Sequence, residues 1–152
     1  MSGSDGGSDA VLVRPAQASD APSVAGLVGQ LAASSGERSP VNVAFVLRCL
    51  NAPASGILIA EVEGEAVGML SYTLRPSLYH AADSCMIEEL AVSQGHRRAG
   101  IGSRLLDGIV ALAREKRCAE VSVSAMASNT VALDFYRRNG FEDDALLLER
   151  HL

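Results

Sequence analysis

The sequence contains no tryptophan, and aromatic residues make up only 4% of its 152 residues. Its 13 lysine and arginine residues are outnumbered by 18 aspartate and glutamate residues, which gives a formal net charge of −5, and no basic run is interleaved with aromatic side chains. A protein that binds nucleic acid needs a basic face for the phosphates. We therefore predict no nucleic-acid partner.

Signals for export, membrane insertion and metal binding are also missing. Residues 1–10 are rich in Ser, Gly and Asp without the basic start or apolar core of a signal peptide, and no apolar run is long enough to span a bilayer. We expect a disordered tail there, then one domain over residues 11–152, in a cytoplasmic protein with no membrane partner. Cys49, Cys85 and Cys118 fall in apolar segments with no C-x-x-C spacing, which predicts buried thiols of a reducing compartment. The histidines are scattered, so we predict no metal.

The sequence does contain apolar residues at strand-like spacing in some segments and at helical spacing in others, a combination typical of a mixed α/β protein. The expected strands cover residues 11–14, 56–62, 66–74, 85–92, 120–125 and 145–151, and the expected helices cover residues 21–33, 41–50, 100–117 and 129–138. The order β-α-α-β-β-β-α-β-α-β predicts a single mixed antiparallel and parallel sheet with helices on both faces. Asp20 or Ser19 is expected to cap the first helix, and Asn129 the last.

The central stretch, residues 86–106, joins a strand to an amphipathic helix through a segment rich in arginine and glycine. That segment reads Arg97-Arg98-Ala99-Gly100-Ile101-Gly102-Ser103. A helix that begins on glycines points unpaired N–H groups and the positive end of its dipole outward, so it suits an anion such as a pyrophosphate, and the arginines add cationic donors. The spacing matches neither a P-loop nor the dinucleotide-binding fingerprint.

The motif Arg97-x-x-Gly100-x-Gly102 resembles the acyl-CoA-binding motif of the GCN5-related N-acetyltransferase (GNAT) superfamily. A strand ending E-L-A-V precedes it, and N-x-x-A-x-x-F-Y-x-x-x-G-F follows over residues 129–141. The resemblance implies a GNAT-like fold and an enzyme that moves an acetyl group from the cosubstrate acetyl-CoA to a primary amine of a small molecule or peptide, directly in a ternary complex. A CoA-binding regulatory module that has lost catalysis is the alternative.

Acetyl transfer to an amine requires a base for the amine, stabilisation of the carbonyl oxygen and support for the departing thiolate. Glu88 and Glu89 are the candidates for the base, because burial in an apolar strand raises a carboxyl pKa towards the useful range. Adjacent strand residues point to opposite faces, so we expect one of them to face the reaction. Glu88 matches the base position that the resemblance implies, while pairing with an arginine or a wet sheet edge is the structural alternative for both.

The cofactor contacts also come from the resemblance. It implies that a splay in the strand frees backbone groups near Leu90, Ala91 and Val92 for the thioester carbonyl and the pantetheine arm. It also implies that residues 97–103 hold the pyrophosphate and that Asn129 contacts the cofactor. A helix N-cap explains Asn129 equally well without a ligand.

Tyr136 matches the family's tyrosine whose phenol lies near the sulfur, which implies a role as acid; packing beside Phe135 is the other explanation. The family's first two helices flank the acceptor site, so residues 34–40 between them are expected to influence specificity. The family usually ends on two strands, yet only about a dozen residues follow Gly140. One strand is therefore very short, missing or supplied by a partner chain, which leaves a homodimer open.

Overall fold

The computed structural model describes residues 10–152, so the tail predicted over residues 1–10 lies, except for Ala10, outside the described residues. The strands are β1 (Leu12–Pro15), β2 (Ser55–Val62), β3 (Glu65–Ser77), β4 (Ala82–Val92) and β5 (Val121–Val123), and the α-helices are α1 (Ala21–Ser34), α2 (Val43–Asn51), α3 (Ile101–Glu115) and α4 (Thr130–Arg138). Single-turn 3₁₀ helices at Ala18–Asp20 and Gln94–His96 precede α1 and α3. The strands form one sheet in the order β1-β2-β3-β4-β5, parallel only between β4 and β5 within the described residues, which confirms the predicted mixed sheet.

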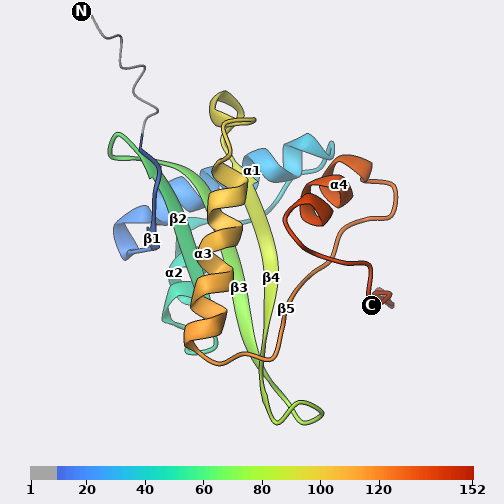
Figure 1. Cartoon of the computed structure of the whole chain (residues 1–152). Coiled ribbons are helices and arrows are strands. Elements are labelled where there is room, and N and C mark those ends of the chain that lie inside the picture. The colour runs from blue at the N-terminus through green and yellow to red at the C-terminus, as the bar shows by residue number, and fades with distance from the viewer. Residues whose placement is uncertain (1–9) are drawn as a thin grey trace, which may run out of the picture.

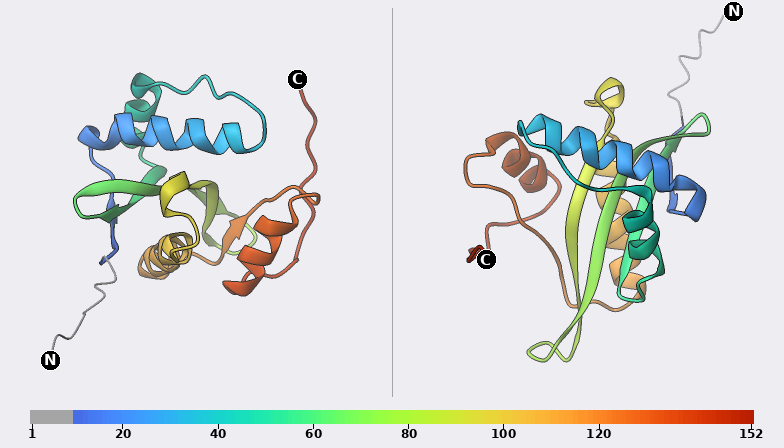
Figure 2. Two further views of the ribbon diagram at one scale, coloured as in Figure 1. Left: turned by 90° about the horizontal axis from the view of Figure 1, so that it is seen from above. Right: turned by 180° about the vertical axis from the view of Figure 1, so that it is seen from behind.

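Helices cover both faces of this sheet, with α1 and α2 on one side and α3 on the other (Figures 1 and 2). Alternating residues of β2 supply both interfaces: Ile57 and Ile59 pack under α1 and α2, whereas Leu58 packs under α3. The α1/α2-side core consists of Ala21, Val24, Leu27, Val46, Ile57, Ile59, Met69 and Ala91, and the α3-side core of Leu58, Ala60, Val62, Val67, Leu70, Cys85, Ile87, Ile101, Leu105, Leu106, Ile109 and Ala113. Because both faces are covered, the middle strands are continuous apolar runs.

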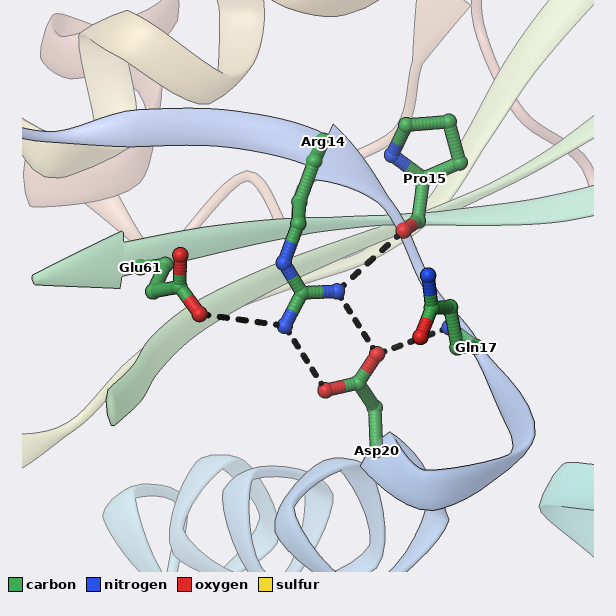
Figure 3. A network of polar contacts seen from close by, with 5 residues as sticks. All are labelled: Arg14, Pro15, Gln17, Asp20 and Glu61. Carbon is green, nitrogen blue, oxygen red and sulfur yellow. Dashed lines mark hydrogen bonds and ion pairs between the residues drawn. The ribbon is translucent and has the colours of Figure 1, made fainter. Parts of the chain in front are cut away.

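A carboxylate network joins β1 to the start of α1 (Figure 3). Arg14 donates from its two terminal nitrogens to the two carboxylate oxygens of Asp20 at 2.7 and 2.9 Å, and it also lies 3.5 Å from a Glu61 oxygen. Asp20 further accepts from the backbone N–H of Gln17 at 2.7 Å. Asp20 is the N-cap residue of α1, but its side chain makes no capping bond to that helix, so the predicted capping role was wrong. The carboxylate turns back to the guanidinium instead, and hydrogen bonding from Arg14 holds the pKa of Asp20 below its usual value.

We expect Asp20→Asn to lower the free energy of unfolding at neutral pH by about 2 kcal/mol, because it leaves a half-buried guanidinium without its carboxylate. The folded pKa is depressed, so this contribution is present above the unfolded value of 3.8 and is lost as the pH falls through the folded pKa. Urea unfolding at several pH values should therefore show that the difference in free energy of unfolding between wild type and variant becomes smaller in acid. Asp107→Asn, on the exposed face of α3, is the control. Equal stability of the Asp20→Asn protein and wild type at neutral pH would contradict this account.

The C-terminal strand predicted over residues 145–151 does not form. The described chain has no helix or strand after Arg138, and Leu146 and Leu148 are 89% and 88% exposed. The predicted strand at residues 120–125 also shortens to three residues, Val121–Val123. A strand needs a neighbour for its backbone hydrogen bonds, and so short an edge strand offers few. The homodimer stays a prediction.

Candidate active site

β4 contains a β-bulge at Glu88. Ser71 of β3 pairs with Glu89 and Tyr72 pairs with Ile87, so Glu88 is an extra residue without a partner on β3. On either side of this point the two strands pair in regular antiparallel register. The bulge lies near the start of the stretch, residues 86–106, that the sequence singled out.

The bulge shifts the alternation of side chains along β4. Before it, Cys85 and Ile87 belong to the α3-side core, and after it Leu90 packs against that same core. As a result Glu88 and Glu89 both line one cavity on the α1/α2 side of the sheet. The prediction that these glutamates point to opposite faces was wrong. Side chains along a strand alternate between its two faces, and one extra residue reverses the order of that alternation. The sequence signal for the bulge was that Ile87 and Leu90, both apolar, are three residues apart.

The two glutamates differ in their contacts. The backbone N–H of Glu89 donates to the Ser71 hydroxyl oxygen at 3.0 Å, and that hydroxyl donates to the Glu89 carboxylate. Glu88 makes no hydrogen bond or ion pair with any part of the described chain, and neither glutamate pairs with an arginine there. Both are exposed, so the predicted burial of a carboxylate in this strand does not occur. Sequence reasoning missed Ser71, since its partner is 18 residues away and only strand pairing brings the two together.

A cavity of about 580 Å³ lies between α1, α2 and the middle of the sheet. It is lined by Val24, Val28, Ser39, Pro40, Val41, Asn42, Phe45, Val46, Cys49, Ser55, Gly56, Ile57, Met69, Ser71, Tyr72, Thr73, Glu88 and Glu89. This volume is typical of a small-molecule site. Helices α1 and α2 and the loop between them flank it, as the resemblance implied for an acceptor site.

The edge of β4 next to β5 is open beyond the bulge. β5 pairs with Cys85 to Ile87 alone, so from Glu88 to Val92 no strand of the described chain lies on that side (Figure 1). A strand edge without a neighbour presents unpaired N–H and C=O groups, to which an extended ligand can add as a further strand. The splay beside Leu90, Ala91 and Val92 that the resemblance implied is therefore present.

Helix α3 begins at this open edge. Gly100 is its N-cap with φ of 78°, a left-handed conformation that suits glycine, and no side chain caps the helix. Within residues 10–152 the N–H groups of Ile101, Gly102 and Ser103 have no acceptor. Gly102 has a different role, because an added Cβ would lie 3.0 Å from Cζ of Phe135. Its missing side chain lets α4 pack against α3.

The arginines before α3 are exposed, as is Ala99. Arg97 donates from Nε to the carbonyl oxygen of Val92 at 3.2 Å, so it ties the loop to the end of β4. Arg98 has φ of 66°, and its guanidinium makes no hydrogen bond within the described chain. Neither arginine forms an ion pair there, so both charges are available beside the start of the helix, and Arg98 also has all its donors free.

Helix α4 places Tyr136 against the α3-side core, between the rings of Phe135 at 5.2 Å and Phe141 at 5.7 Å. Burial raises the pKa of its phenol. The hydroxyl has no hydrogen-bond partner within residues 10–152. Every buried side-chain oxygen in that range does have a partner, so the Tyr136 hydroxyl is not buried and reaches solvent. Asn129 accepts from the backbone N–H of Ala132 at 3.1 Å and caps α4, as its sequence context predicted.

Glu88 and Tyr136 thus lie on opposite faces of the sheet, Glu88 on the cavity side and Tyr136 on the α3 side. Within the described residues no group of three His, Cys, Asp or Glu side chains is placed to hold a metal ion. None of the helices described is both long and apolar enough to cross a membrane.

Comparison with known proteins agrees with this geometry. Residues 30–141 match the Acetyltransferase (GNAT) family. An aminoglycoside acetyltransferase from an uncultured soil metagenomic sample, in complex with trehalose, is 25% identical with a TM-score of 0.81, over 93% of this chain and 96% of that one. A transcriptional regulator from Bacillus halodurans C-125 is 25% identical with a TM-score of 0.83, over 94% and 100%.

A third similar structure is AAC(6′)-Iy in complex with a bisubstrate analogue, CoA-S-monomethyl-acetylneamine. It is 20% identical with a TM-score of 0.80, over 94% of this chain and 99% of that one, and at this identity it supports the fold alone. The family match covers most of the sequence and includes both the bulged strand and the glycine-led helix. The chain belongs to the acetyltransferase (GNAT) family, as the resemblance of its motifs predicted.

Proposed function

We propose that the protein transfers an acetyl group from acetyl-CoA to a primary amine of a small molecule or peptide, directly in a ternary complex. The observation that carries this proposal is the bulge at Glu88. It presents an unpartnered carboxylate where an apolar cavity meets the open edge of β4. A base between an acceptor cavity and an extended binding edge is what acetyl transfer to an amine requires.

The residues present fit acetyl-CoA, which would supply an activated acetyl thioester. Ala91 turns its backbone groups to Met69 of β3, so the groups on the open edge that can bind an extended pantetheine arm are those of Leu90 and the N–H of Val92, whose carbonyl already accepts from Arg97. The unpaired N–H groups of residues 101–103 and the charge of Arg98 suit a pyrophosphate. Asn129 already caps α4, so we assign it no further bond to the cofactor.

Glu88 is our candidate for the base. A primary amine is protonated near neutral pH and must lose a proton before its nitrogen can attack a carbonyl carbon. Glu88 faces the cavity with no partner in the described chain, so its oxygens are free to take that proton. Glu89 is held by Ser71, and we propose that it positions the incoming ammonium by its charge.

Tyr136 is our candidate for the acid. Its raised pKa keeps the phenol protonated at physiological pH, so the hydroxyl can donate to a departing thiolate. The rings on either side fix the phenol without engaging its oxygen. A donor held in place but unpartnered suits a role that is needed only when the thiolate forms.

Tyr136→Phe should lower kcat by about 100-fold while leaving acetyl-CoA affinity nearly unchanged, because it removes one donor and no packing surface. Because burial raises the phenol pKa, loss of the phenol proton should reduce wild-type kcat only at a higher pH than it would for an exposed tyrosine. CoA thiol release gives kcat, and calorimetry gives the affinity. Tyr79→Phe, on the 93% exposed tyrosine of the β3–β4 hairpin, is the matched control. Wild-type kcat in the Tyr136→Phe protein would remove this tyrosine from the mechanism.

The proposed activity is tested by measuring release of free CoA thiol from acetyl-CoA across a panel of amines. Aminoglycosides belong in the panel, because a protein of similar structure is an aminoglycoside acetyltransferase. Turnover on one class of amine would support the proposal. Tight binding of acetyl-CoA without turnover on any amine would favour the regulatory module instead.

We also propose that the protein works in the cytoplasm. All three cysteines are free thiols in the structure. Cys85 is fully buried in the α3-side core, and burial raises its pKa to about 11. Thiols of this kind suit a reducing compartment.

A further inference from the structure

The wall of the cavity beside Glu88 is mainly apolar, and its charged side chains all come from β4. Helices α1 and α2 and strands β2 and β3 contribute to it the side chains Val24, Val28, Phe45, Val46, Ile57 and Met69. Among the described residues that line the cavity, Glu88 and Glu89 are the only charged ones. A ligand that fills this space therefore meets carboxylates at one end and hydrocarbon along its length.

Of the hydroxyl and amide side chains in the wall, Ser39, Asn42 and Ser71 already bond to the protein, whereas Ser55, Tyr72 and Thr73 make no side-chain hydrogen bond within the described chain. Asn42 accepts from the backbone N–H of Phe45 at 2.9 Å, where it caps α2, and Ser39 accepts from the backbone N–H of Val41 at 3.2 Å. Ser71 is bonded to Glu89. A ligand that carries many hydroxyl or ammonium groups would lose more hydrogen bonds to water here than these few hydroxyls and the two carboxylates can replace, which is costly.

A positive charge lies beside the α2 end of the cavity, on the exposed Arg48, which is not itself part of the wall. The Cζ atom of Arg48 lies 5.5 Å from the centroid of the Phe45 ring, and this ring is part of the wall. Arg48 makes no ion pair with the described chain. A ligand ammonium at this end would be repelled by the guanidinium, whereas an ammonium at the β4 end meets two carboxylates.

We infer that the acceptor is a monoamine with an apolar body, an alkylamine or arylalkylamine, and that polyamines and aminoglycosides are poor acceptors. The inference rests on the proposed function, because it requires that the acceptor amine enters this cavity towards Glu88. Its basis is the distribution of charge: two carboxylates at β4, no charge elsewhere in the wall, and the Arg48 guanidinium beside the Phe45 ring at α2. Only an amine with a single ammonium at one end matches that distribution.

A matched pair of substrates tests the inference. Hexylamine and 1,6-diaminohexane have the same chain and differ in one terminal ammonium. We expect kcat/KM, from CoA thiol release, to be about tenfold or more higher for hexylamine, because the second ammonium of the diamine would be desolvated without a partner. Calorimetric titration of both amines into the protein saturated with CoA should show the same order of affinity and does not depend on turnover.

A pair of double variants tests the role of the α2 end. Phe45→Glu with Arg48→Gln places a carboxylate there, and Phe45→Gln with Arg48→Gln differs from it by that one charge. The first should bring the diamine up to or above hexylamine in kcat/KM, and the second should not. Position 45 lies in the first turn of α2 and is 52% exposed, so a glutamate there is compatible with the helix.

The possible failures are distinct. If the wild type prefers the diamine or kanamycin, and this activity is lost in Glu88→Gln, the inferred substrate class is wrong and the proposed function stands. If no amine is acetylated although acetyl-CoA binds, the proposed function fails and the inference falls with it. If the Phe45→Glu, Arg48→Gln protein still prefers hexylamine as strongly as the wild type, the α2 end does not contact the far end of the acceptor, and that part of the inference is wrong.

Discussion

Glu88→Gln should lower kcat/KM for the best amine by about a thousandfold, with little effect on the stability of the fold. Glutamine has nearly the same shape as glutamate but cannot take the proton of the ammonium. The side chain is exposed and makes no bond within the described chain, so its replacement disrupts no packing. The deficit should narrow as the assay pH approaches the pKa of the free amine, because a larger fraction of the amine is then already neutral. CoA thiol release over a range of pH measures both effects.

Glu89→Gln is the control for this experiment. It lies next to Glu88, lines the same cavity and carries the same charge, but its carboxylate is held by Ser71. We expect its effect to fall mainly on KM, and to be about tenfold, because it weakens attraction of the ammonium and removes no proton acceptor. A larger loss of kcat in Glu89→Gln than in Glu88→Gln would make Glu89 the base.

Gly100→Glu should weaken acetyl-CoA binding by about 100-fold or more. The new carboxylate would stand at the start of α3, where the unpaired N–H groups of residues 101–103 point and where we place the pyrophosphate. No atom lies within 4 Å of an added Cβ at Gly100, so the side chain itself meets no obstacle. Calorimetric titration with acetyl-CoA measures the affinity.

Gly100→Gln separates charge from backbone strain. Any side chain at Gly100 must adopt its left-handed conformation, φ of 78°, which costs about 1 kcal/mol in both variants. Thermal unfolding should therefore show similar stability for the two proteins, with the glutamate slightly favoured by the helix dipole. If the glutamine variant loses as much affinity as the glutamate variant, the backbone conformation matters and the assignment to pyrophosphate fails.

The helix α3 was predictable because its information is local. Ile101, Leu105 and Ile109 recur at helical spacing, and all three are buried against the sheet. The bulge at Glu88 also had a local signal, the three-residue spacing between Ile87 and Leu90, which face the same core. It was missed because strict alternation of side chains along the strand was assumed. A period of two holds only while each residue has a partner on the neighbouring strand.

The features that could not be predicted depend on segments far apart in the sequence. Ser71 and Glu89 meet only because β3 and β4 pair, and the open edge exists because β5 separates from β4 after Ile87. The sequence showed strands at these places, whereas the splay between them was supplied by the family resemblance. The same limit explains residues 145–151, whose apolar pattern suits a strand but which pair with no strand of the described chain.

The bulge also has a consequence for engineering this scaffold. Because Glu88 is the additional residue of β4, the position of its carboxylate depends on the length of the strand as well as on the residue type. A shortened β4 that lacks one residue here would pair with β3 without interruption, and no choice of side chain would restore both glutamates to the cavity. Exchange of this strand with that of another protein must therefore conserve the spacing between Ile87 and Leu90, and an alignment gap at this point would matter more than a substitution beside it.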